Sequence, residues 1–487
     1  MNLSRSIRIL TGMAALSLTA CISVGPDYQR PTAAVAQSYK ELGEWKPIEP
    51  KAAASDLAWW SIYNDPVLDG LERQIAVSNE SLKATEASYR QALEIVEENR
   101  AGYGPTVTAN ASGQRSHAYT PLGASPSSSS IQNQVTASLG ASWAPDIWGK
   151  IRRAVESSKA SAQASAADLA AARLSLQSTL ATDYFALRID DELKHLYEQT
   201  VKAYEETLEI TRNQFEAGTA AETDVITAET QLLGEQAQLI SVGVQRAQLE
   251  HAIAVLIGKT PDQFSIVPAE LARVVPVVPV GMPSTLLERR PDIAAAERAA
   301  AAASAQIGVA TAAYYPSITL SGSIGFVNTA LGGLFQTSNE VWSLGPQLAE
   351  TLFDSGLRHA QVGAARAAYD GAVATYRQTV LAAFQQVEDE LAALRILEQQ
   401  EEVLKRTVES AREAVRLTVY QYEAGTVAYT SVVTVQAIAL SDEQNLLTTL
   451  GSQLSASVAL VAALGGGWDS AMLAEASSYG PTSGPSH

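Results

Sequence analysis

The sequence predicts an α+β membrane protein in which long helices carry two pairs of strands, and in which the whole arrangement occurs twice along the chain. Three observations support this prediction. The stretch FEAGTAAETDVITAE (215–229) returns as YEAGTVAYTSVVTVQ (422–436) at an offset of 425 − 218 = 207 residues. A long proline-free stretch precedes each copy, and segments of alternating apolar and polar residues lie near the front of each half.

The composition is typical of helices packed through small side chains. Hydrophobic residues make up 46% of the chain, but aromatic residues only 6%. The net charge is −18 with 34 Lys and Arg residues, whereas phosphate binding requires a basic surface. We therefore expect no nucleic-acid partner.

The N-terminus predicts a lipoprotein signal peptide over residues 1–20. Arg5 and Arg8 precede an apolar stretch that is too short to span a bilayer. The stretch ends in Leu-Thr-Ala-Cys, and Cys21 is the one cysteine of the chain. This closely resembles a bacterial lipobox, whose cysteine is lipidated, and Ile22 resembles an outer-membrane address; a plain signal peptide with a chance cysteine is the alternative. A lipidated Cys21 leaves no free thiol, which excludes cysteine-redox chemistry.

The rest of the chain divides into segments by periodicity and proline content. The predicted segments are an extended equatorial segment (21–58), the helices of repeat 1 (59–104), a first transmembrane hairpin (105–145), a first long helical hairpin (146–258), an equatorial linker with five prolines (259–283), the helix of repeat 2 (284–315), a second transmembrane hairpin (316–352), a second long helical hairpin (353–465) and a C-terminal tail (466–487).

Each long helical hairpin is predicted from an uninterrupted stretch followed by a glycine. Residues 150–216 and 357–423 contain no proline, and at 1.5 Å per residue each would form a rod of about 100 Å. Gly218 and Gly425 then stand where a chain reversal requires a positive φ. Shorter helices are expected to follow, from about 222 to 257 and from about 429 to 464. We expect no transmembrane helix after the signal, because no stretch reaches about 20 apolar residues.

The strand pairs begin after Pro105 and Pro316, where the apolar period changes to two. The predicted strands are 106–113, 131–143, 317–326 and 341–348. Polar loops, 117–133 and 327–340, connect them. One face is apolar and the other small and polar, as in transmembrane barrels and also in soluble half-buried hairpins. In lipid, four strands with open edges leave backbone groups unsatisfied and cannot enclose a lumen, so several copies would have to close a barrel together.

Motifs spread over nearly the whole mature chain resemble the TolC-like family of outer-membrane efflux lipoproteins, in the group that serves RND-type pumps. The motifs are GPDY (25–28) with Pro31, WW (59–60), DPVL (65–68), DIWGKIR (146–152), RRPDI (289–293) and LFDSG (352–356). Each is weak alone, but their order is specific. The resemblance implies a homotrimer with a twelve-stranded transmembrane β-barrel, four strands coming from each chain. It also implies a long α-helical barrel in the periplasm and a belt around its middle.

The resemblance also implies where partners bind. In this family the helical tips dock a periplasmic adaptor protein. Carried over to this chain, the docking residues are Ala217, Gly218, Thr219, Ala424, Gly425 and Thr426. The alternative is that the two glycines only end their helices, and both interpretations can hold together.

A periplasmic gate just beyond the tips, often built from aspartates in the family, is the second implied site. Here it corresponds to Asp224, Tyr429, Thr430 and Ser431. Where related channels commonly carry acids, this chain has Ala428 and Thr434, which weakens the case for an acid-based lock in the second copy. An exposed surface acid is the alternative for Asp224.

The common catalytic, metal-binding and nucleotide-binding motifs are absent from the sequence. The five histidines are scattered, and there is no HExxH, GxSxG, P-loop or dinucleotide-binding turn. Asp190-Asp191 and Glu388-Asp389-Glu390 are expected to form solvated or lumen-facing surface. We therefore expect no enzyme activity, no metal and no cofactor.

The function implied is a lipid-anchored exit channel in the outer membrane that extends into the periplasm. It would passively conduct small toxic compounds or ions delivered by an inner-membrane RND pump and a periplasmic adaptor. Two alternatives remain: a duct for type I protein secretion, and a non-channel periplasmic lipoprotein scaffold built on coiled coils.

Overall fold

The computed structural model describes residues 23–42, 58–119, 129–271, 275–278, 280 and 282–476. The predicted signal peptide and Cys21 lie outside these residues. The described chain divides into two compact units. Unit 1 holds the described parts of 1–32, 89–164 and 296–376, and unit 2 holds those of 33–88, 165–295 and 377–487.

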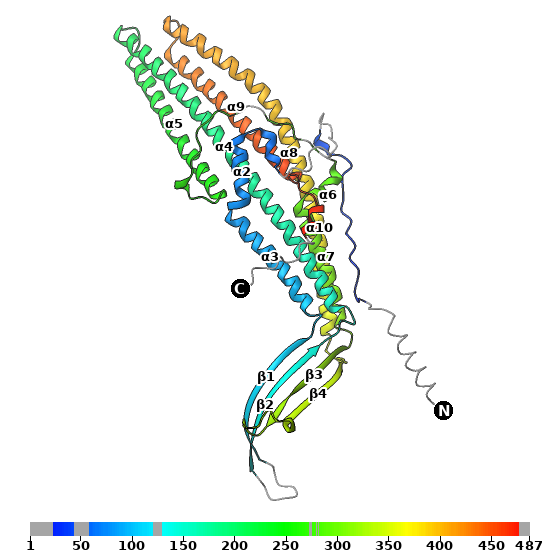
Figure 1. Ribbon diagram of the computed structural model, residues 1–487. Coiled ribbons are helices and arrows are strands. Elements are labelled where there is room, and N and C mark those ends of the chain that lie inside the picture. The colour runs from blue at the N-terminus through cyan, green and yellow to red at the C-terminus, as the bar shows by residue number, and fades with distance from the viewer. Residues whose placement is uncertain are drawn as a thin grey trace. The chain divides into compact units, whose positions relative to one another are not determined.

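The elements follow the predicted order of helices, strands and helices, and this order occurs twice along the chain (Figure 1). They are η1 (Lys40–Leu42), η3 (Trp59–Tyr63), α2 (Pro66–Ser78), α3 (Glu80–Ala101), β1 (Thr106–Tyr119), β2 (Ser129–Trp143), α4 (Lys150–Glu216), α5 (Glu222–Leu256), η4 (Pro261–Gln263), η5 (Pro283–Thr285), α6 (Leu286–Arg289), α7 (Pro291–Ala312), β3 (Ser317–Asn328), η6 (Thr337–Asn339), β4 (Glu340–Ala349), α8 (Leu357–Glu423), α9 (Tyr429–Ala463) and α10 (Ala471–Ala476).

The helical hairpins confirm the duplication. Helices α4 and α8 each contain 67 residues, and α5 and α9 each contain 35. An aspartate lies shortly before each long helix and accepts hydrogen bonds from its N-terminal turn. Asp146 accepts hydrogen bonds from the backbone N–H of Ile151 at 2.9 Å and of Arg152 at 2.8 Å. Asp354 accepts one from the N–H of Arg358 at 3.2 Å, and such carboxylates satisfy the free donors of a helix N-terminus.

The four strands of unit 1 form one antiparallel sheet in the order β1-β2-β3-β4. Its register places apolar residues opposite one another, since Ala109 pairs with Leu139, Leu139 with Ile324, and Ile324 with Trp342. Of these, Leu139, Ile324 and Trp342 are at least half exposed in the single chain. The sheet therefore has one continuous apolar face without a cover, as the alternation predicted, and β1 and β4 are its edges.

The predicted loop boundaries of the first strand pair were too wide. The loop was expected to span 117–133, but β1 continues to Tyr119 and β2 begins at Ser129. Ladder hydrogen bonds join backbone groups, so polar side chains such as those around Asn133 do not end a strand. In the second pair the loop was expected to span 327–340, but β3 continues to Asn328.

Aromatic side chains gather where the strands of unit 1 begin and end. The indole N–H of Trp143 donates to the carbonyl of Tyr103 at 2.9 Å. The ring of Trp148 stacks on Tyr315 with centroids 4.9 Å apart, and its N–H donates to the carbonyl of Pro316 at 2.7 Å. Such rings with one polar edge are typical of the interface between membrane and water.

An extended N-terminal strap, residues 23–32, packs on the helices of unit 1. The N–H of Val24 donates to the carbonyl of Trp148 at 3.1 Å, and the guanidinium of Arg153 contacts the carbonyl of Val24 at 3.2 Å. Gly25 crosses Gly308 so closely that a Cβ on Gly25 would stand 2.4 Å from the Cα of Gly308. The strap can therefore lie on α7 only because both positions are glycine.

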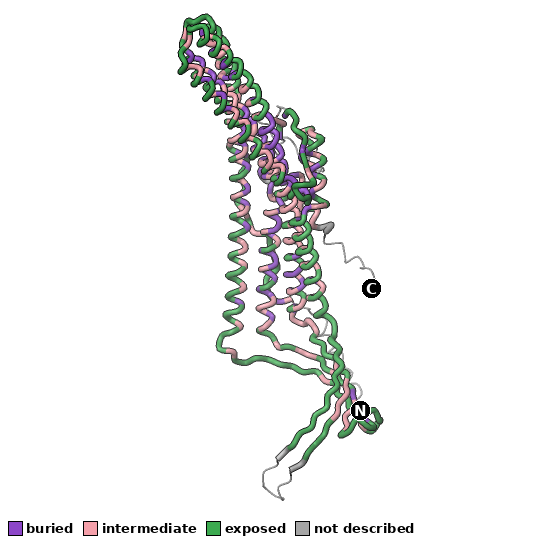
Figure 2. Tube along the Cα trace, turned by 90° about the vertical axis from the view of Figure 1, so that its left-hand side faces the viewer, coloured by how far each residue is buried: buried purple, intermediate pink, exposed green. Residues whose placement is uncertain are grey.

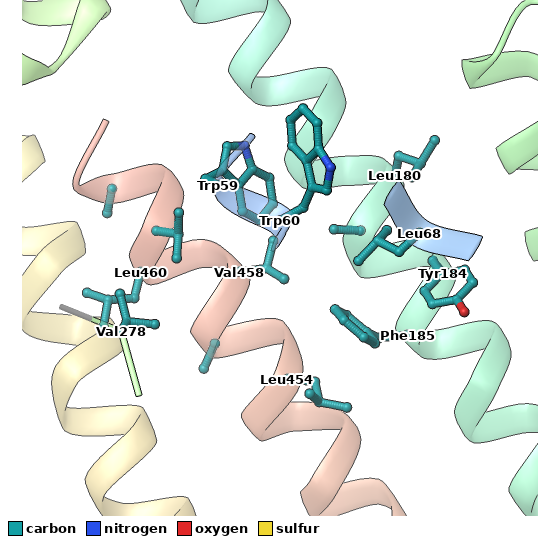
Figure 3. Packing of buried hydrophobic residues seen from close by; sticks show 14 of the residues in the cluster. Trp59, Trp60, Leu68, Leu180, Tyr184, Phe185, Val278, Leu454, Val458 and Leu460 are labelled. Carbon is teal, nitrogen blue, oxygen red and sulfur yellow. The ribbon is translucent and has the colours of Figure 1, made fainter. Parts of the chain in front are cut away.

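The core of unit 2 lies where α2, α4, α5, α8 and α9 converge (Figure 3). Leu68, Leu180, Leu454 and Leu460 are at most 1% exposed. Burial of each such side chain contributes about 1.5–3 kcal/mol. Figure 2 shows that the buried residues run between the helices, while the outer faces are exposed.

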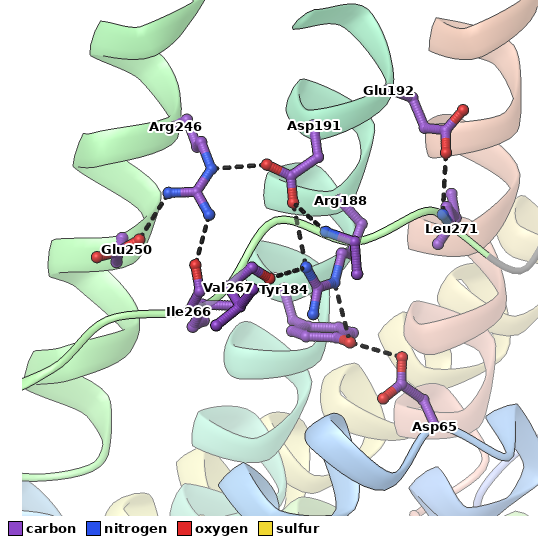
Figure 4. A network of polar contacts seen from close by, with 11 residues as sticks. Asp65, Tyr184, Arg188, Asp191, Glu192, Arg246, Glu250, Ile266, Val267 and Leu271 are labelled. Carbon is purple, nitrogen blue, oxygen red and sulfur yellow. Dashed lines mark hydrogen bonds and ion pairs between the residues drawn. The ribbon is translucent and has the colours of Figure 1, made fainter. Parts of the chain in front are cut away.

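A polar network in unit 2 holds the equatorial linker against α4 and α5 (Figure 4). We call it the linker clamp, and it consists of Asp65, Tyr184, Arg188, Asp191, Arg246 and Glu250. Arg188 donates to Asp191 at 3.1 Å and to the carbonyl of Val267 at 2.8 Å. Arg246 donates to Asp191 at 2.6 Å and to the carbonyl of Ile266 at 2.6 Å.

The expectation that Asp190-Asp191 is solvated or lumen-facing was wrong, because both carboxylates are buried at the linker clamp. The side chain of Asp191 is 4% exposed and lies between two arginines. Asp190 is also buried, and this burial together with the charge of Asp191 raises the pKa of its carboxyl to about 6. Sequence spacing could not show this, because Arg246 and the linker are far from Asp191 along the chain.

Two further predictions concern the C-terminal part of the chain. By length and composition alone, helix α9 could cross a membrane. Most of its apolar 18-residue window is buried within the chain, however, as in the core helix of a protein. Of the predicted C-terminal tail (466–487), the structure describes residues 466–476. Trp468 is buried against Ala167 and Ala294, and α10 follows it.

Glu72 on α2 is a buried acid without a partner. It is fully buried, and neither carboxylate oxygen has a hydrogen-bond partner. Burial raises the pKa of this carboxyl to about 9 from an ordinary value of 4.5. Because the folded pKa is the higher one, the stability contributed by the neutral carboxyl is complete below pH 4.5 and is lost as the pH rises towards 9.

We expect Glu72→Gln to raise the melting temperature at alkaline pH and to flatten its pH dependence. The amide never ionises, so the substitution removes a slope of at most about 1.4 kcal/mol per pH unit. Thermal melts of the detergent-solubilised protein across this range measure the effect. Glu98→Gln on the exposed face of α3 is the matched control, and an unchanged pH profile in Glu72→Gln would contradict the assignment.

Candidate functional site

The first helical hairpin reverses at a glycine turn. The N–H of Thr219 donates to the carbonyl of Gln214 at 2.8 Å, and the N–H of Gly218 to the carbonyl of Phe215 at 2.9 Å. Gly218 has a φ of +74°, the left-handed conformation that closes a helix in this hydrogen-bond pattern. The predicted positive φ is confirmed.

The second hairpin has the same turn. The N–H of Thr426 donates to the carbonyl of Gln421 at 2.9 Å, and Gly425 has a φ of +70°. All six predicted docking residues are exposed, and a Cβ at either glycine would meet no atom within 4 Å. The turns are therefore small and accessible, and they stand on two hairpins with helices of equal length.

The structure separates the four predicted gate residues. Tyr429 is 2% exposed, whereas Thr430 and Ser431 are exposed and Asp224 is half-buried. Thr430 and Ser431 therefore do not pack between the two hairpins of the chain. Tyr429 does, and its position at the first turn of α9 directs it towards the first hairpin.

A cluster near the turns joins the two hairpins, and we call it the tip cluster. The rings of Tyr422 and Tyr429 lie 5.4 Å apart. They pack with residues of α4, α5 and α9: Tyr204, Leu208, Ala228, Leu232 and Val432. Tyr422 was not predicted. A signal existed, because it stands three residues before Gly425 where the first copy has Phe215.

Hydrogen bonds cross the same contact, and we call this set the tip seam. Tyr422 donates to the hydroxyl of Thr211 at 3.2 Å. Gln436 donates to the hydroxyl of Thr207 at 3.3 Å, and Tyr429 donates to the side-chain oxygen of Gln231 at 3.4 Å. Each bond runs from the second hairpin to the first.

The charge of Asp224 acts on this seam. Burial raises the pKa of Tyr429 to about 12, with smaller contributions from Tyr422, Tyr204 and the carboxylate of Asp224. Burial also raises the pKa of Tyr422, and Asp224 adds to the effect. Both phenols therefore keep their protons and remain hydrogen-bond donors. Of the predicted gate residues, Tyr429 belongs to the tip cluster, Asp224 is half-buried, and Thr430 and Ser431 are exposed.

No group of three or more His, Cys, Asp or Glu side chains that could hold a metal occurs among the residues that the structure describes. The candidate site consists of two exposed turns and a hydrogen-bonded contact between the hairpins.

Comparisons with known proteins match this architecture. The sequence profile of the family described as outer membrane efflux protein matches residues 71–259 and 282–466, one segment on each side of the linker. The toluene efflux pump outer membrane protein TtgC of Pseudomonas putida is 31% identical over 472 residues, which cover 94% of this chain and 96% of TtgC. The outer membrane protein OprJ of Pseudomonas aeruginosa is 31% identical over 464 residues, covering 94% of this chain and 95% of OprJ.

Solved structures give the same result. The outer-membrane channel OprN superposes with a TM-score of 0.85 at 30% identity, covering 92% of this chain and 99% of that chain. The open state of the MtrE outer membrane channel of Neisseria gonorrhoeae superposes with a TM-score of 0.78 at 28% identity, covering 91% of this chain and 98% of that chain.

Proposed function

The chain belongs to the family of outer membrane efflux proteins, and from that premise we propose that three copies of it form the exit duct of a tripartite pump. It is an outer-membrane efflux channel, not an enzyme. The finer proposal concerns how the copies close, where an adaptor binds, what holds the duct shut, and what it conducts.

The open-edged sheet is the observation that carries the closure by several copies, and the number three follows from the family. Strands β1 and β4 end the sheet on either side, and the apolar face that includes Leu139 and Trp342 is exposed in the single chain. In hydrocarbon such a face is favourable, but unpaired edges are not. Three copies joined edge to edge give twelve strands, with β4 of one copy beside β1 of the next. The long helices then continue the pore into the periplasm.

A periplasmic adaptor protein docks on the two glycine turns. Both turns are exposed and contain no side chain larger than threonine at Ala217, Gly218 and Thr219 or at the equivalent positions of the second copy. Helix tips of an adaptor can therefore approach the backbone closely at six equivalent places around a trimer. The inner-membrane RND pump drives the transport, because the duct has no energy source of its own.

The tip seam and tip cluster hold the resting duct closed. Tyr422 and Tyr429 fix the second hairpin to the first through the packing of the tip cluster and the hydrogen bonds of the tip seam. Adaptor contact at the turns opens the duct by displacing the hairpins. The exposed Thr430 and Ser431 face away from this contact within the chain, so their role at the gate would require a second copy or the lumen.

The cargo consists of small toxic compounds or ions. TtgC is named for toluene efflux, and a passive duct accepts whatever its pump delivers. Neither TtgC nor OprJ is named for protein secretion or for a scaffold role.

Two measurements test the proposed function. Cells that lack the gene are expected to accumulate a pump substrate and to recover export when the full chain is restored. The purified protein is expected to run as a trimer in detergent and to conduct weakly in planar bilayers. The proposal would be contradicted if the purified protein were a monomer without conductance and if cells that lack the gene exported normally.

Cys21 anchors the N-terminus by its lipid. Val24 of the strap is held beside Trp148, and the three residues from Cys21 to Val24 can span at most about 10 Å. The lipid therefore enters the membrane close to the strand ends of unit 1.

We expect Cys21→Ser to remove the acyl groups but to leave barrel insertion intact, because the exposed apolar face of the sheet supplies its own membrane affinity. Mass spectrometry of the N-terminal peptide and membrane fractionation measure the two properties. Ser23→Ala, which keeps the cysteine, is the control. Recovery of the Cys21→Ser protein only as a soluble periplasmic monomer would argue against the barrel.

A further inference from the structure

A pocket of about 580 Å³ lies within unit 2, between α4, α8 and α9, with the first residues of α7 at one end. Leu174 of α4 and Ala459 and Ala462 of α9 contribute to its apolar lining. Pockets that bind small organic molecules commonly have about 300–1,000 Å³ and a mostly apolar lining with a few polar groups. This pocket has the size and the lining for such a ligand.

Four charged residues line the pocket, and two of them form a closed ion pair. Arg290 donates to the two carboxylate oxygens of Asp292 at 3.0 and 2.6 Å. Its remaining terminal nitrogen donates to the carbonyl of Ala463 at 3.0 Å. The guanidinium is therefore satisfied by the protein itself and leaves no positive charge for an anionic ligand.

The other two charged residues are carboxylates without a counterion. Asp183 on α4 and Glu390 on α8 are half-buried, and neither has a hydrogen bond or ion pair among the residues that the structure describes. Burial raises the pKa of Asp183, and burial together with the charge of Asp389 raises the pKa of Glu390. A carboxylate that has lost water without gaining a partner is stabilised by any cation that reaches it.

The uncharged polar groups add acceptors to this lining. The hydroxyl of Ser178 donates to the carbonyl of Leu174 at 2.8 Å, and that of Thr179 donates to the carbonyl of Ser175 at 2.9 Å. Each hydroxyl has a single proton, so these two oxygens can only accept from a ligand. The remaining polar side chains of the lining, Ser175, Thr182 and Gln386, can donate or accept.

We propose that this pocket binds organic amines, with the ammonium group at Asp183 or Glu390 and the apolar body against Leu174 and the alanines of α9. An ammonium group has donors only, which matches a lining with an excess of acceptors and two uncompensated negative charges. A neutral molecule would leave both carboxylates without a partner, and an anion would be repelled.

On α8 the pocket lies on the face turned away from the N-terminal segment. Glu388 accepts hydrogen bonds from the backbone N–H of Lys40 at 2.7 Å and of Glu41 at 2.9 Å. Glu388 stands two positions from both Gln386 and Glu390, which is about 200° around a helix. The segment and the pocket are therefore on opposite faces of α8.

Helix α4 shows the same division. Asp191 of the linker clamp stands nine positions from Thr182 of the pocket, which is about 180° around the helix. The linker and the N-terminal segment belong to the belt around the helical barrel of the proposed duct. Because the pocket faces away from both, it opens to the lumen, where amines pass on their way out. This last step rests on the proposed function.

Dansylcadaverine, an apolar fluorophore that carries a primary amine, tests the pocket on the detergent-solubilised full chain. We expect saturable binding that is at least about tenfold weaker in the double variant Asp183→Asn, Glu390→Gln, because one charge-assisted hydrogen bond is worth about that factor. Asp389→Asn removes the exposed carboxylate next to Glu390 and is the matched control, which should bind as wild type does.

Two further readouts identify the charge as the cause. The N-acetyl derivative of dansylcadaverine, which is neutral, should bind wild type no better than it binds the double variant. Binding of the amine to wild type should weaken as the pH falls, from a higher pH than the ordinary pKa values of 3.8 and 4.5 would give. Equal affinity of wild type and the double variant for the amine would overturn the inference.

Current through the protein in planar bilayers tests whether the pocket opens to the lumen. We expect dansylcadaverine to reduce the conductance of wild type and to leave that of the double variant unchanged. Saturable binding without any reduction in current would overturn the lumen assignment. A monomer without conductance that still binds the amine would overturn the proposed duct but leave the pocket standing, because a single chain supplies its whole lining.

Discussion

Replacing Gly218 by arginine is expected to reduce export more than tenfold while leaving the trimer and its barrel intact. The left-handed φ of +74° costs a non-glycine residue about 1–2 kcal/mol, which is little for a hairpin built on helices of 67 and 35 residues. No atom lies within 4 Å of the added Cβ. The effect therefore comes from a bulky cation on the surface proposed for the adaptor.

Three variants separate this effect from others. Gly425→Arg places the same charge on the second turn and is expected to act in the same way. Gly243→Arg on the exposed face of α5, where a Cβ also meets nothing, controls for charge and should export normally. Export of a pump substrate and trimer mass in detergent are the readouts. Normal export in both turn variants would overturn the docking assignment, and loss of the trimer would assign the effect to folding.

Replacing Arg188 by methionine is expected to cause the largest loss of stability. The side chains of Arg188 and Asp191 are each 4% exposed, and removal of Arg188 breaks this buried pair and leaves Asp191 with Arg246 as its remaining arginine partner. Breaking a buried ion pair costs up to about 3–5 kcal/mol. The substitution also releases the carbonyl of Val267 and the hydroxyl of Tyr184, which Arg188 contacts at 2.8 and 3.1 Å.

Thermal melts of the detergent trimer, followed by the helical circular dichroism signal, measure this loss. Arg73→Met removes an exposed ion pair with Asp69 and is expected to cost less than about 1 kcal/mol. Arg188→Lys should recover only part of the stability, because lysine lacks the fork that reaches both acceptors. A melting temperature of Arg188→Met equal to that of Arg73→Met would contradict the role of the clamp.

The helices and strands could be predicted from sequence to a large extent, because their signals are local. The proline-free stretch ending at Glu216 and the glycine at 218 define a hairpin without reference to any other part of the chain. Strand alternation placed Leu139 and Ile324 on one face, and the pairing of these two residues confirmed it. The boundaries of β1 and β2 were less accurate, because strand pairing continues through polar residues.

The contacts of the candidate site could not be predicted in the same way. The seam joins Tyr422 to Thr211, and the clamp joins Asp191 to Arg246, pairs that no helical or strand periodicity brings together. Sequence motifs indicated Thr430 and Ser431 as gate residues because of their position after the turn. Only the helix rotation in the fold shows that Tyr429 faces inward while those two face outward.

The linker clamp has a mechanical consequence for the first hairpin. It fixes α4 at Asp191, and the helix continues for about 25 residues to Glu216, a lever arm of about 38 Å that the tip seam joins to the second hairpin. A tilt of only about 5° at this pivot moves the turn by about 3 Å, the scale of a side-chain contact. The channel mouth can thus be driven by small rotations at its waist, with no helix needing to unwind.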